Sequence, residues 1–304
     1  MINLPILNKG DAVAIVATAR KVNLVDLNYA IQYLDKQGYI PVIGSSIGME
    51  KNQFAGTDQE RALDLMQQII DPKVKAIWCA KGGYGSVRIL PYLNAETIKS
   101  HPKFLIGYSD VTALHAYWHK LGLPSIHGQM AVGCQTKTNE TLASVFTLLK
   151  GGATCYKFKA KPFLKTGKVT APIVGGNLSM LYSICGSRFN FDTVGKILFL
   201  EDIDEYLYHI DRMMLNLKNN GLLTKLKGVL IGGLTSMNDN EVPFGKTAEA
   251  IIWEHVKDLN CPVAFGFPSG HISDNRAFIQ GRLASLEVTD KQVQFKQLAY
   301  GCTQ

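Results

Sequence analysis

The first 150 residues alternate short apolar runs with longer segments whose apolar residues have helical spacing. Apolar runs occupy residues 11–17, 40–43 and 74–79, and another begins at Phe104. Continuous apolar runs of this length are typical of parallel strands that are buried on both faces. A regular alternation of strand and helix predicts an open, mostly parallel sheet covered by helices on both faces. The predicted fold class is therefore α/β.

Two of the helical segments carry signals for where they begin and end. Thr57 and Glu60 have the spacing of a capping box, which predicts a helix that runs to Ile70. Asn23 is a suitable cap for an earlier helix, which Gly38 can end. Each helix follows a predicted strand closely, as a parallel sheet requires.

Beyond residue 156 the pattern changes. A lysine-rich stretch at 157–168 contains Pro162 and Gly167 and predicts a linker. We therefore expect two domains, residues 1–156 and 169–304. In the second we expect strands at 169–174, 196–200, 227–231 and 262–265, helices near 177–185, 205–219 and 247–259, and a terminal hairpin within 284–298.

Composition excludes several classes of protein. The 304 residues are 46% hydrophobic and 19% charged, which is typical of a soluble globular protein with a large core. No apolar run approaches the roughly 18 residues that a membrane-spanning helix needs. The first ten residues do not have the pattern of a secretory signal. The six cysteines, of which the last is Cys302, form no C-x-x-C pair and predict reduced thiols in a cytoplasmic protein.

The charge balance is moderately basic. The 32 basic and 25 acidic residues give a net charge of +7. The one concentration of lysines comprises Lys157, Lys159, Lys161, Lys165 and Lys168. Few aromatic residues lie among them, so we expect a solvated linker and no nucleic-acid partner. A mild attraction for acidic small molecules is compatible with this charge.

The run that begins at Phe104 ends in an abrupt change of pattern at Ser109-Asp110. Residues 111–118 follow with helical spacing, so the serine lies at a corner between a strand and a helix. A hydroxyl at such a corner projects from the sheet, and the unpaired N–H groups of the helix start can stabilise an oxyanion. Ser109 is therefore a candidate nucleophile. Both Ser109 and Asp110 are also favoured helix caps, and this stretch alone does not separate the two roles.

A glycine-rich turn, Lys81-Gly-Gly-Tyr-Gly85, follows a predicted strand and opens a short helix. Glycines there allow a ligand to approach the backbone and leave N–H groups free to bind it. The turn matches neither a P-loop nor a G-x-G-x-x-G dinucleotide loop. A purely structural tight turn explains it equally well.

Two more candidates follow predicted strands in the second half. Glu201 comes directly after the apolar run at 196–200, where a carboxylate can orient and charge-stabilise a histidine. The acids at 204–205 are explained by the dipole of the next helix. His271 lies in a turn-rich loop that contains Gly270, and loop histidines are often functional. Ser109, Glu201 and His271 thus form a serine–acid–histidine set in the chain order Ser…Glu…His.

The remaining histidines are weaker candidates. His115 and His119 are four residues apart on the predicted helix after Ser109, which is a spacing that can bind a metal. No third ligand is evident and H-E-x-x-H is absent, so we expect neither a metal site nor a cofactor.

Together these motifs resemble the LD-carboxypeptidases with a Ser-Glu-His triad, which include the muramoyltetrapeptide carboxypeptidases and the microcin C immunity peptidases. The matching segments run in family order across nearly the whole chain. They are Gly82-Gly-Tyr-Gly85, Gly107-Tyr-Ser-Asp-Val-Thr112, Gly175-Gly-Asn-Leu178, Leu200-Glu-Asp-Ile-Asp-Glu205 with Tyr208 and Asp211-Arg212, and Gly270-His271 with Asn275. Two departures, Thr18-Ala19 for the common Pro-Ser and Gln129 after the glycine of His127-Gly128, lie near the presumed cleft.

The resemblance implies an N-terminal flavodoxin-like domain and a smaller C-terminal α/β domain with a β-rich swivelling or barrel-like core. It also implies a homodimer with the site at the junction of the domains. By position, Ser109 corresponds to the nucleophile, His271 to the general base and acid, and Glu201 to the carboxylate that orients it. The backbone N–H groups of Gly83 and Asp110 correspond to the oxyanion hole.

The activity that the resemblance implies is that of a cytoplasmic serine carboxypeptidase. Such an enzyme cuts the L,D bond of murein tetrapeptides in peptidoglycan recycling and releases D-alanine. Its substrate has a free carboxylate, for which Arg88 and Arg212 are candidate partners, and Gly82 and Tyr84 are further candidate contacts. One alternative is an immunity-type peptidase that cleaves the amide of a peptidyl- or aminoacyl-nucleotide. The other is a non-catalytic binder of anionic small molecules.

Overall fold

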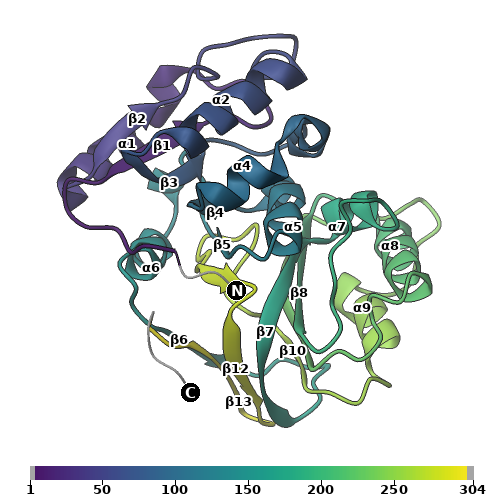
Figure 1. The fold of residues 1–304 in the computed structure, drawn as a ribbon. Coiled ribbons are helices and arrows are strands. Elements are labelled where there is room, and N and C mark those ends of the chain that lie inside the picture. The colour runs from purple at the N-terminus through teal and green to yellow at the C-terminus, as the bar shows by residue number, and fades with distance from the viewer. Residues whose placement is uncertain (1–3, 300–304) are drawn as a thin grey trace.

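The sheet that carries the Ser109 corner draws strands from both halves of the chain. The computed structural model describes residues 4–299. This first sheet consists of β1 (Ala12–Val16), β2 (Ile40–Ile43), β3 (Val74–Cys79), β4 (Phe104–Gly107), β5 (Ser125–His127) and β11 (Phe278–Gln280). Its strand order is β11-β5-β4-β3-β1-β2, and all pairs are parallel except β11 with β5 (Figure 1). The order 2-1-3-4-5 of the first five strands confirms the flavodoxin-like arrangement.

Helices cover both faces of this sheet, as the sequence predicts. They are α1 (Asn28–Gln37), α2 (Asp58–Ile70), α3 (Ser86–Ile89), α4 (Ala95–Ser100), α5 (Thr112–Lys120) and α6 (Asn139–Leu149). The capping box of α2 is present, since the Glu60 N–H donates to Thr57 Oγ1 and the Thr57 N–H donates to Glu60 Oε2. Gly38 ends α1 in the left-handed conformation. The short α4 is an element that the sequence analysis missed.

The second sheet has seven strands in the order β10-β9-β8-β7-β12-β13-β6. They are β6 (Thr154–Lys159), β7 (Gly167–Asn177), β8 (Ile197–Ile203), β9 (Gly228–Thr235), β10 (Val263–Phe265), β12 (Leu283–Val288) and β13 (Gln292–Gln297). The four strands from β10 to β7 are parallel, and the rest pair antiparallel. Helices α7 (Leu178–Ile184), α8 (Leu207–Asn219) and α9 (Ala248–Val256) cover one face of the parallel part (Figure 1). Over residues 4–299 this sheet is open, so the barrel-like form that we expected for its core is not found.

Part of the segment that we predicted as a linker is a strand. Residues 157–159, which we expected to begin a linker, lie in β6 and pair with β13, so that Phe158 faces Val293. Strand β11 crosses back from the C-terminal half into the first sheet, where Ile279 pairs with Ile126. The lysines of β6 point to solvent from a strand at the edge of its sheet. Charged side chains commonly keep an edge strand from pairing with another chain. Here the lysines gave residues 157–159 the composition of a linker, so the strand was not predicted.

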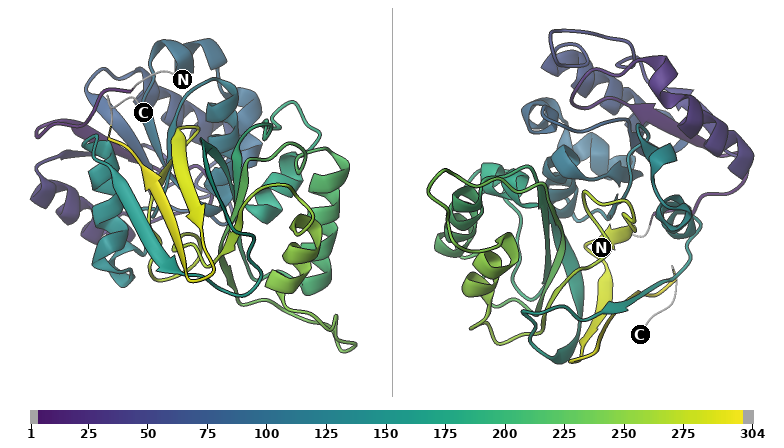
Figure 2. Two further views of the ribbon diagram at one scale, coloured as in Figure 1. Left: turned by 90° about the horizontal axis from the view of Figure 1, so that it is seen from below. Right: turned by 180° about the vertical axis from the view of Figure 1, so that it is seen from behind.

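One apolar core runs through both halves and fixes their relation. Leu114 and Trp118 of α5 belong to the same buried cluster as Val174 of β7 and Leu181 of α7. Figure 2 shows, from below and from behind, the long strands of the second sheet running up to the first. The helix that follows Ser109 is therefore packed against the sheet that carries Glu201.

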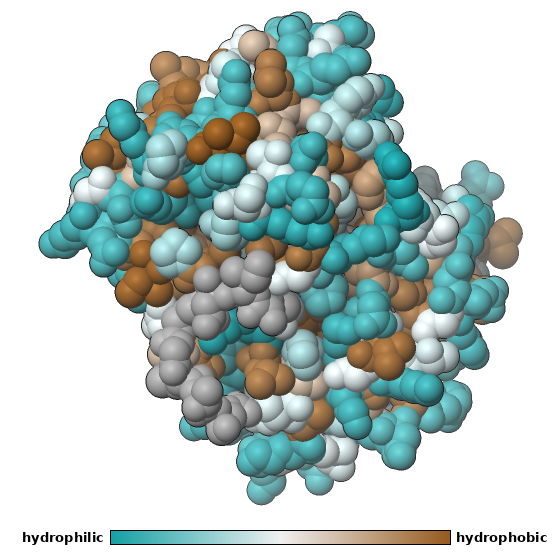
Figure 3. Space-filling view, viewed as in Figure 1, coloured by the Kyte–Doolittle hydropathy of each residue, from teal (hydrophilic) through white to brown (hydrophobic). Residues whose placement is uncertain are grey.

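The visible face of the molecule is largely hydrophilic, and its described cysteines are unpaired. Hydrophilic residues cover most of the face in Figure 3, with apolar side chains in small groups. In the described part of the chain no helix has both the length and the apolar character to cross a membrane. The five cysteines within residues 4–299 are free thiols, and Cys302 lies outside the described residues.

Candidate active site

Ser109 lies on a strained corner between β4 and α5. It has φ of +62°, a conformation that non-glycine residues rarely adopt, and begins a 3-10 turn that leads into α5. The corner is closely packed, because a Cβ on Gly107 would lie 2.7 Å from Val111 Cγ1. The His115 ring also binds the corner, with Nε2 2.8 Å from the Gly107 carbonyl oxygen. The backbone thus presents the serine hydroxyl in a fixed position.

Asp110 holds the glycine-rich turn against this corner. Its carboxylate accepts hydrogen bonds from the N–H groups of Gly85 (3.2 Å) and Ser86 (2.8 Å). The side chain is only 2% exposed. Burial raises the pKa of Asp110, and the hydrogen bonds from Ser86 and Gly85 oppose that rise. This structural role of the side chain was missed by the sequence analysis, which considered only a helix cap and the backbone N–H of Asp110.

The two backbone N–H groups expected in an oxyanion hole are both available. Gly83 and Asp110 line one cavity together with Ser109. Within residues 4–299, neither of their N–H groups has a hydrogen-bond partner. Gly83 has φ of +100°, which only glycine adopts readily. The turn therefore exposes a free donor beside the serine.

Glu201 is an internal residue of β8 and not a residue just beyond a strand. It pairs with Asn177 of β7 and is completely buried. Its Oε2 lies 2.7 Å from His271 Nδ1 and also accepts the His271 backbone N–H at 3.2 Å. The loop can approach so closely because residue 270 is glycine: with φ of +107°, a Cβ there would lie 2.7 Å from Glu201 Oε2.

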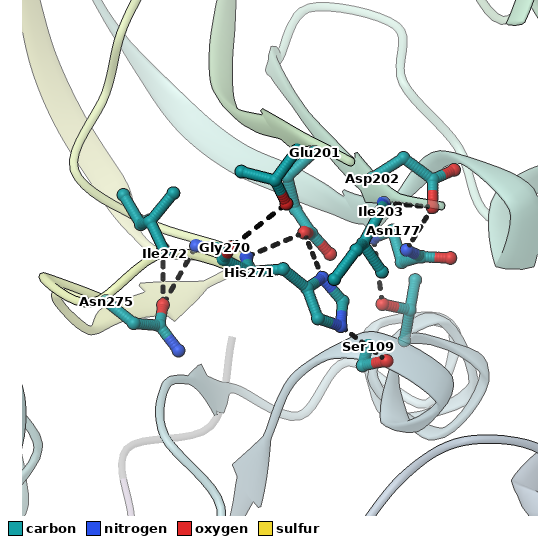
Figure 4. A network of polar contacts seen from close by, with 12 residues as sticks. Ser109, Asn177, Glu201, Asp202, Ile203, Gly270, His271, Ile272 and Asn275 are labelled. Carbon is teal, nitrogen blue, oxygen red and sulfur yellow. Dashed lines mark hydrogen bonds and ion pairs between the residues drawn. The ribbon is translucent and has the colours of Figure 1, made fainter. Parts of the chain in front are cut away.

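His271 completes a hydrogen-bonded chain of three side chains (Figure 4). Its Nε2 lies 3.0 Å from Ser109 Oγ, on the opposite side of the ring from Glu201. Asn275 fixes the loop by accepting the Gly270 N–H at 2.9 Å, and the Tyr108 ring lies 4.9 Å from the imidazole. Burial alone would lower the pKa of His271, but the negative charge and hydrogen bond of Glu201 raise it above its ordinary value.

The cavity in front of these residues holds about 510 Å³ and is lined by both basic and acidic side chains. Arg20 and Lys81 lie on the wall built by the N-terminal half. The other wall, from the end of β8 onward, carries Asp202, Asp204 and Glu205. Burial, together with the charge of Glu201, raises the pKa of Asp202 to about 7.

Of the four residues predicted to contact the substrate, only one lines this cavity. Gly82 lines the cavity, but Arg88, Arg212 and Tyr84 do not. Arg88 is paired with Asp58 through two hydrogen bonds, and the Arg212 guanidinium lies 5.0 Å from the ring centre of Tyr208. Tyr84 packs instead near Phe54. The expected role of these two arginines in holding a substrate carboxylate therefore has no support from their positions.

Two further histidines, His115 of α5 and His127 of β5, are buried in the protein interior. His115 Nδ1 lies 2.8 Å from Ser125 Oγ, and burial lowers the pKa of His115 to about 4. His127 is fully buried and stacked on Phe278, and burial lowers its pKa well below the usual value. Within residues 4–299 no group of three or more His, Cys, Asp or Glu side chains is arranged to hold a metal.

Comparison with known proteins identifies this arrangement. The N-terminal domain model of the LD-carboxypeptidases matches residues 13–128, and their C-terminal domain model matches residues 170–286. The chain belongs to the LD-carboxypeptidase family. Residues 129–169, which include β6, lie between the two matched segments.

Two carboxypeptidase relatives match at least 90% of the chain, and an immunity protein matches two thirds of it. A probable murein peptide carboxypeptidase of Bacillus subtilis is 35% identical, and the alignment covers 94% of this chain and 91% of the relative. The murein tetrapeptide carboxypeptidase of Pseudomonas aeruginosa is 30% identical, over 90% of this chain and 92% of the relative. The microcin C7 self-immunity protein MccF of Escherichia coli is 28% identical, over 66% of this chain and 68% of the relative. The crystal structure of muramoyltetrapeptide carboxypeptidase from Oxalobacter formigenes superposes with a TM-score of 0.87 at 28% identity. The superposition covers 96% of this chain and 100% of that structure.

Proposed function

We propose that the protein is a serine-type LD-carboxypeptidase that releases the terminal D-alanine of murein tetrapeptides through an acyl-enzyme. The observation that carries this proposal is the hydrogen-bonded chain from Glu201 through His271 to Ser109. It opens onto a cavity that also contains two free backbone donors. Nucleophile, base and orienting acid are the parts that amide hydrolysis by a serine enzyme requires.

The hydrogen-bond geometry supports one arrangement of the protons in the neutral imidazole. Glu201 accepts the Nδ1–H of His271, which leaves Nε2 unprotonated and able to accept the proton of the Ser109 hydroxyl 3.0 Å away. As Ser109 Oγ attacks the scissile carbonyl carbon, its proton moves to His271 Nε2. Glu201 stabilises the imidazolium, and the free N–H groups of Gly83 and Asp110 stabilise the oxyanion.

The second half of the cycle uses the same groups. Collapse of the tetrahedral intermediate breaks the C–N bond, and the imidazolium gives its proton to the leaving amine. D-Alanine then leaves, and a water molecule enters beside His271. The histidine takes a proton from this water as its oxygen attacks the ester carbon. The bond from that carbon to Ser109 Oγ then breaks, His271 returns the proton to Oγ, and the shortened peptide leaves with a new carboxylate.

Two features of the cavity support a peptide substrate with charges of both signs. Arg20 and Lys81 provide cationic groups for a carboxylate, and the facing acidic wall can accept an ammonium group. The names of the two carboxypeptidase relatives point to murein peptides as the substrate class. We also propose, from the resemblance to the family, that the enzyme works in the cytoplasm as a homodimer.

The deciding experiment offers the protein two substrates in parallel. Murein tetrapeptide and an aminoacyl-sulfamoyl adenosine are incubated with the enzyme, and products are followed by mass spectrometry. We expect tripeptide and free D-alanine from the first substrate. Cleavage of the nucleoside conjugate alone would replace our proposal with an immunity-type peptidase.

A fluorophosphonate probe separates an enzyme from a non-catalytic binder. We expect a single covalent adduct, which peptide mapping places on Ser109. A protein that binds the tetrapeptide but neither cleaves it nor reacts with the probe would be a binder of anionic small molecules. Light scattering of the purified protein tests the homodimer in the same preparation.

A further inference from the structure

A peptidase that releases a C-terminal residue must hold a free carboxylate very close to the bond it cuts. The carboxyl carbon is two bonds from the amide nitrogen, so it lies within about 4 Å of the scissile carbonyl carbon. A cationic group for this carboxylate must therefore line the same cavity as Ser109. Arg88 and Arg212 do not meet this condition, since neither lines the cavity.

Arg20 meets the condition and lies beside an expected oxyanion donor. Its side chain packs directly on Gly83, because a Cβ on that glycine would lie 2.6 Å from both Cδ and Nε of the arginine. In the part of the chain that the structure describes, no carboxylate forms an ion pair with Arg20. The guanidinium is thus uncommitted and adjacent to the place where the scissile carbonyl oxygen binds.

The backbone that carries Arg20 is firmly held. Hydrogen bonds join Ala19 to Ala55 and Lys21 to Gln53, one on each side of the arginine. Arg20 also forms an isolated β-bridge with Phe54. An anchored backbone with a free guanidinium is a preorganised site for a carboxylate.

The same segment is fastened to the glycine-rich turn. Thr18 Oγ1 lies 2.9 Å from Ser86 Oγ, and the buried Arg61 donates to the carbonyl oxygens of both Thr18 and Gly85. These contacts hold the segment that carries Arg20 against the turn that carries the donor of Gly83. A carboxylate on Arg20 and a carbonyl oxygen at Gly83 are therefore kept in a fixed relation.

The charges of the cavity give the substrate a direction. Asp204 and Glu205, which also line the cavity, repel a carboxylate. Lys81, which also lines the cavity on the cationic side, adds to the attraction at longer range. We propose that Arg20 binds the carboxylate of the residue that is released and makes the enzyme a carboxypeptidase. This inference rests on the proposed function.

The test compares the tetrapeptide with its C-terminal amide, which lacks the carboxylate charge. We expect Arg20→Gln to lower kcat/KM for the free acid by roughly 10- to 100-fold, the loss of a hydrogen bond to a charged group. The rate on the amide should change little, so the preference for the acid collapses. Arg20→Lys should restore part of that preference, and circular dichroism verifies that each variant is folded.

Two matched variants sharpen the assignment. Arg88→Gln removes an arginine of the same turn region that is paired with Asp58, and we expect it to keep the preference for the acid. Lys81→Gln should reduce that preference less than Arg20→Gln does. If Arg88→Gln or Lys81→Gln abolishes the preference while Arg20→Gln keeps it, the proposal is wrong.

The outcomes also separate this inference from the proposed function. A wild-type enzyme that cleaves neither peptide overturns the proposed function itself. A wild-type enzyme that prefers the acid, with an Arg20→Gln variant that prefers it equally, overturns only the role of Arg20. An equal loss on acid and amide in Arg20→Gln also contradicts the proposal, because the arginine would then act away from the carboxylate.

Discussion

The two halves of the molecule build their parts of the site in different ways. The N-terminal half contributes mainly backbone: the strained turn at Ser109 and the free N–H groups of Gly83 and Asp110. The C-terminal half contributes side chains, the buried Glu201 and the loop residue His271. The catalytic proton path passes from one half to the other through the 3.0 Å contact between Ser109 and His271.

This difference determines how each part can fail. A part made of backbone depends on the conformations that glycine permits and on the packing beneath the turn. A part made of side chains depends on charge and on the tautomer of one histidine. Substitutions therefore have separate signatures: a change in the C-terminal part alters the response to pH, whereas a change in the turn lowers the rate at every pH.

The largest effect is expected where the two parts meet. Ser109→Ala removes the nucleophile, and we expect kcat on the tetrapeptide to fall by about 10⁶, as in other serine hydrolases. The substitution leaves Glu201 and His271 in place, so tetrapeptide binding measured by calorimetry should persist. Activity within tenfold of the wild type would show that the reaction does not pass through this serine.

Glu201→Gln tests the side-chain part alone. The amide has nearly the same shape but can donate a hydrogen to Nδ1, which favours the wrong tautomer of His271. We expect a loss of about 10⁴ in kcat, as for the acid of other serine triads. Steady-state kinetics measures the loss, and reaction of Ser109 with a fluorophosphonate should slow in parallel. A variant with full activity would assign Glu201 a structural role only.

Gly83→Ala tests the backbone part. A Cβ at φ of +100° strains the turn and contacts Arg20, which moves the N–H away from the oxyanion. We expect kcat to fall on the order of 100-fold, as when one oxyanion donor is lost. Gly10→Ala is the matched control, since Gly10 has φ of +88° with nothing within 4 Å of an added Cβ. Similar thermal destabilisation of both with a loss of activity in both would show that strain alone is responsible.

The sequence revealed the two parts of the site unequally. The turn at Ser109 and the glycines at 82–85 were visible as local patterns, because their chemistry depends on neighbouring residues. Glu201 and His271 are 70 residues apart, and only their order and residue types suggested a pair. Their 2.7 Å contact requires a glycine at 270 beside a buried strand, which no local pattern specifies.

Sequence reasoning failed where partners lie far apart in the chain. Arg88 seemed available for a carboxylate, but it is paired with Asp58, 30 residues earlier. Arg20 had no motif around it, and its place over Gly83 depends on pairing between residues 19–21 and 53–55. Strand β6 was missed for a similar reason, since its alternating lysines are explained only by its position at a sheet edge.

The pH dependence gives the smallest and most specific test. Glu201 raises the pKa of His271 above 6.5 despite burial, and the reaction needs the neutral imidazole. We therefore expect kcat/KM to fall as the pH drops through an inflection above 6.5. Glu201→Gln removes the main effect that opposes burial, so the inflection of the residual activity should move to lower pH. An inflection at the same pH in both enzymes would contradict the coupling.

Stability should respond to pH in the opposite sense. Because the pKa of His271 is higher in the folded state, its pairing with Glu201 stabilises the fold fully below the unfolded pKa and loses that contribution as the pH rises through the folded pKa. A lower pH therefore protonates His271, so it can no longer act as the base, but it also strengthens the ion pair between His271 and Glu201. Denaturant unfolding from about pH 6 to 8 of wild type and Glu201→Gln measures this contribution together with that of Asp202, whose pKa Glu201 also raises. Both contributions make the unfolding free energy of wild type relative to the variant fall as the pH rises. A difference in unfolding free energy that stays constant would mean that His271 keeps one charge state throughout, and one that grows with pH would contradict a raised pKa of His271.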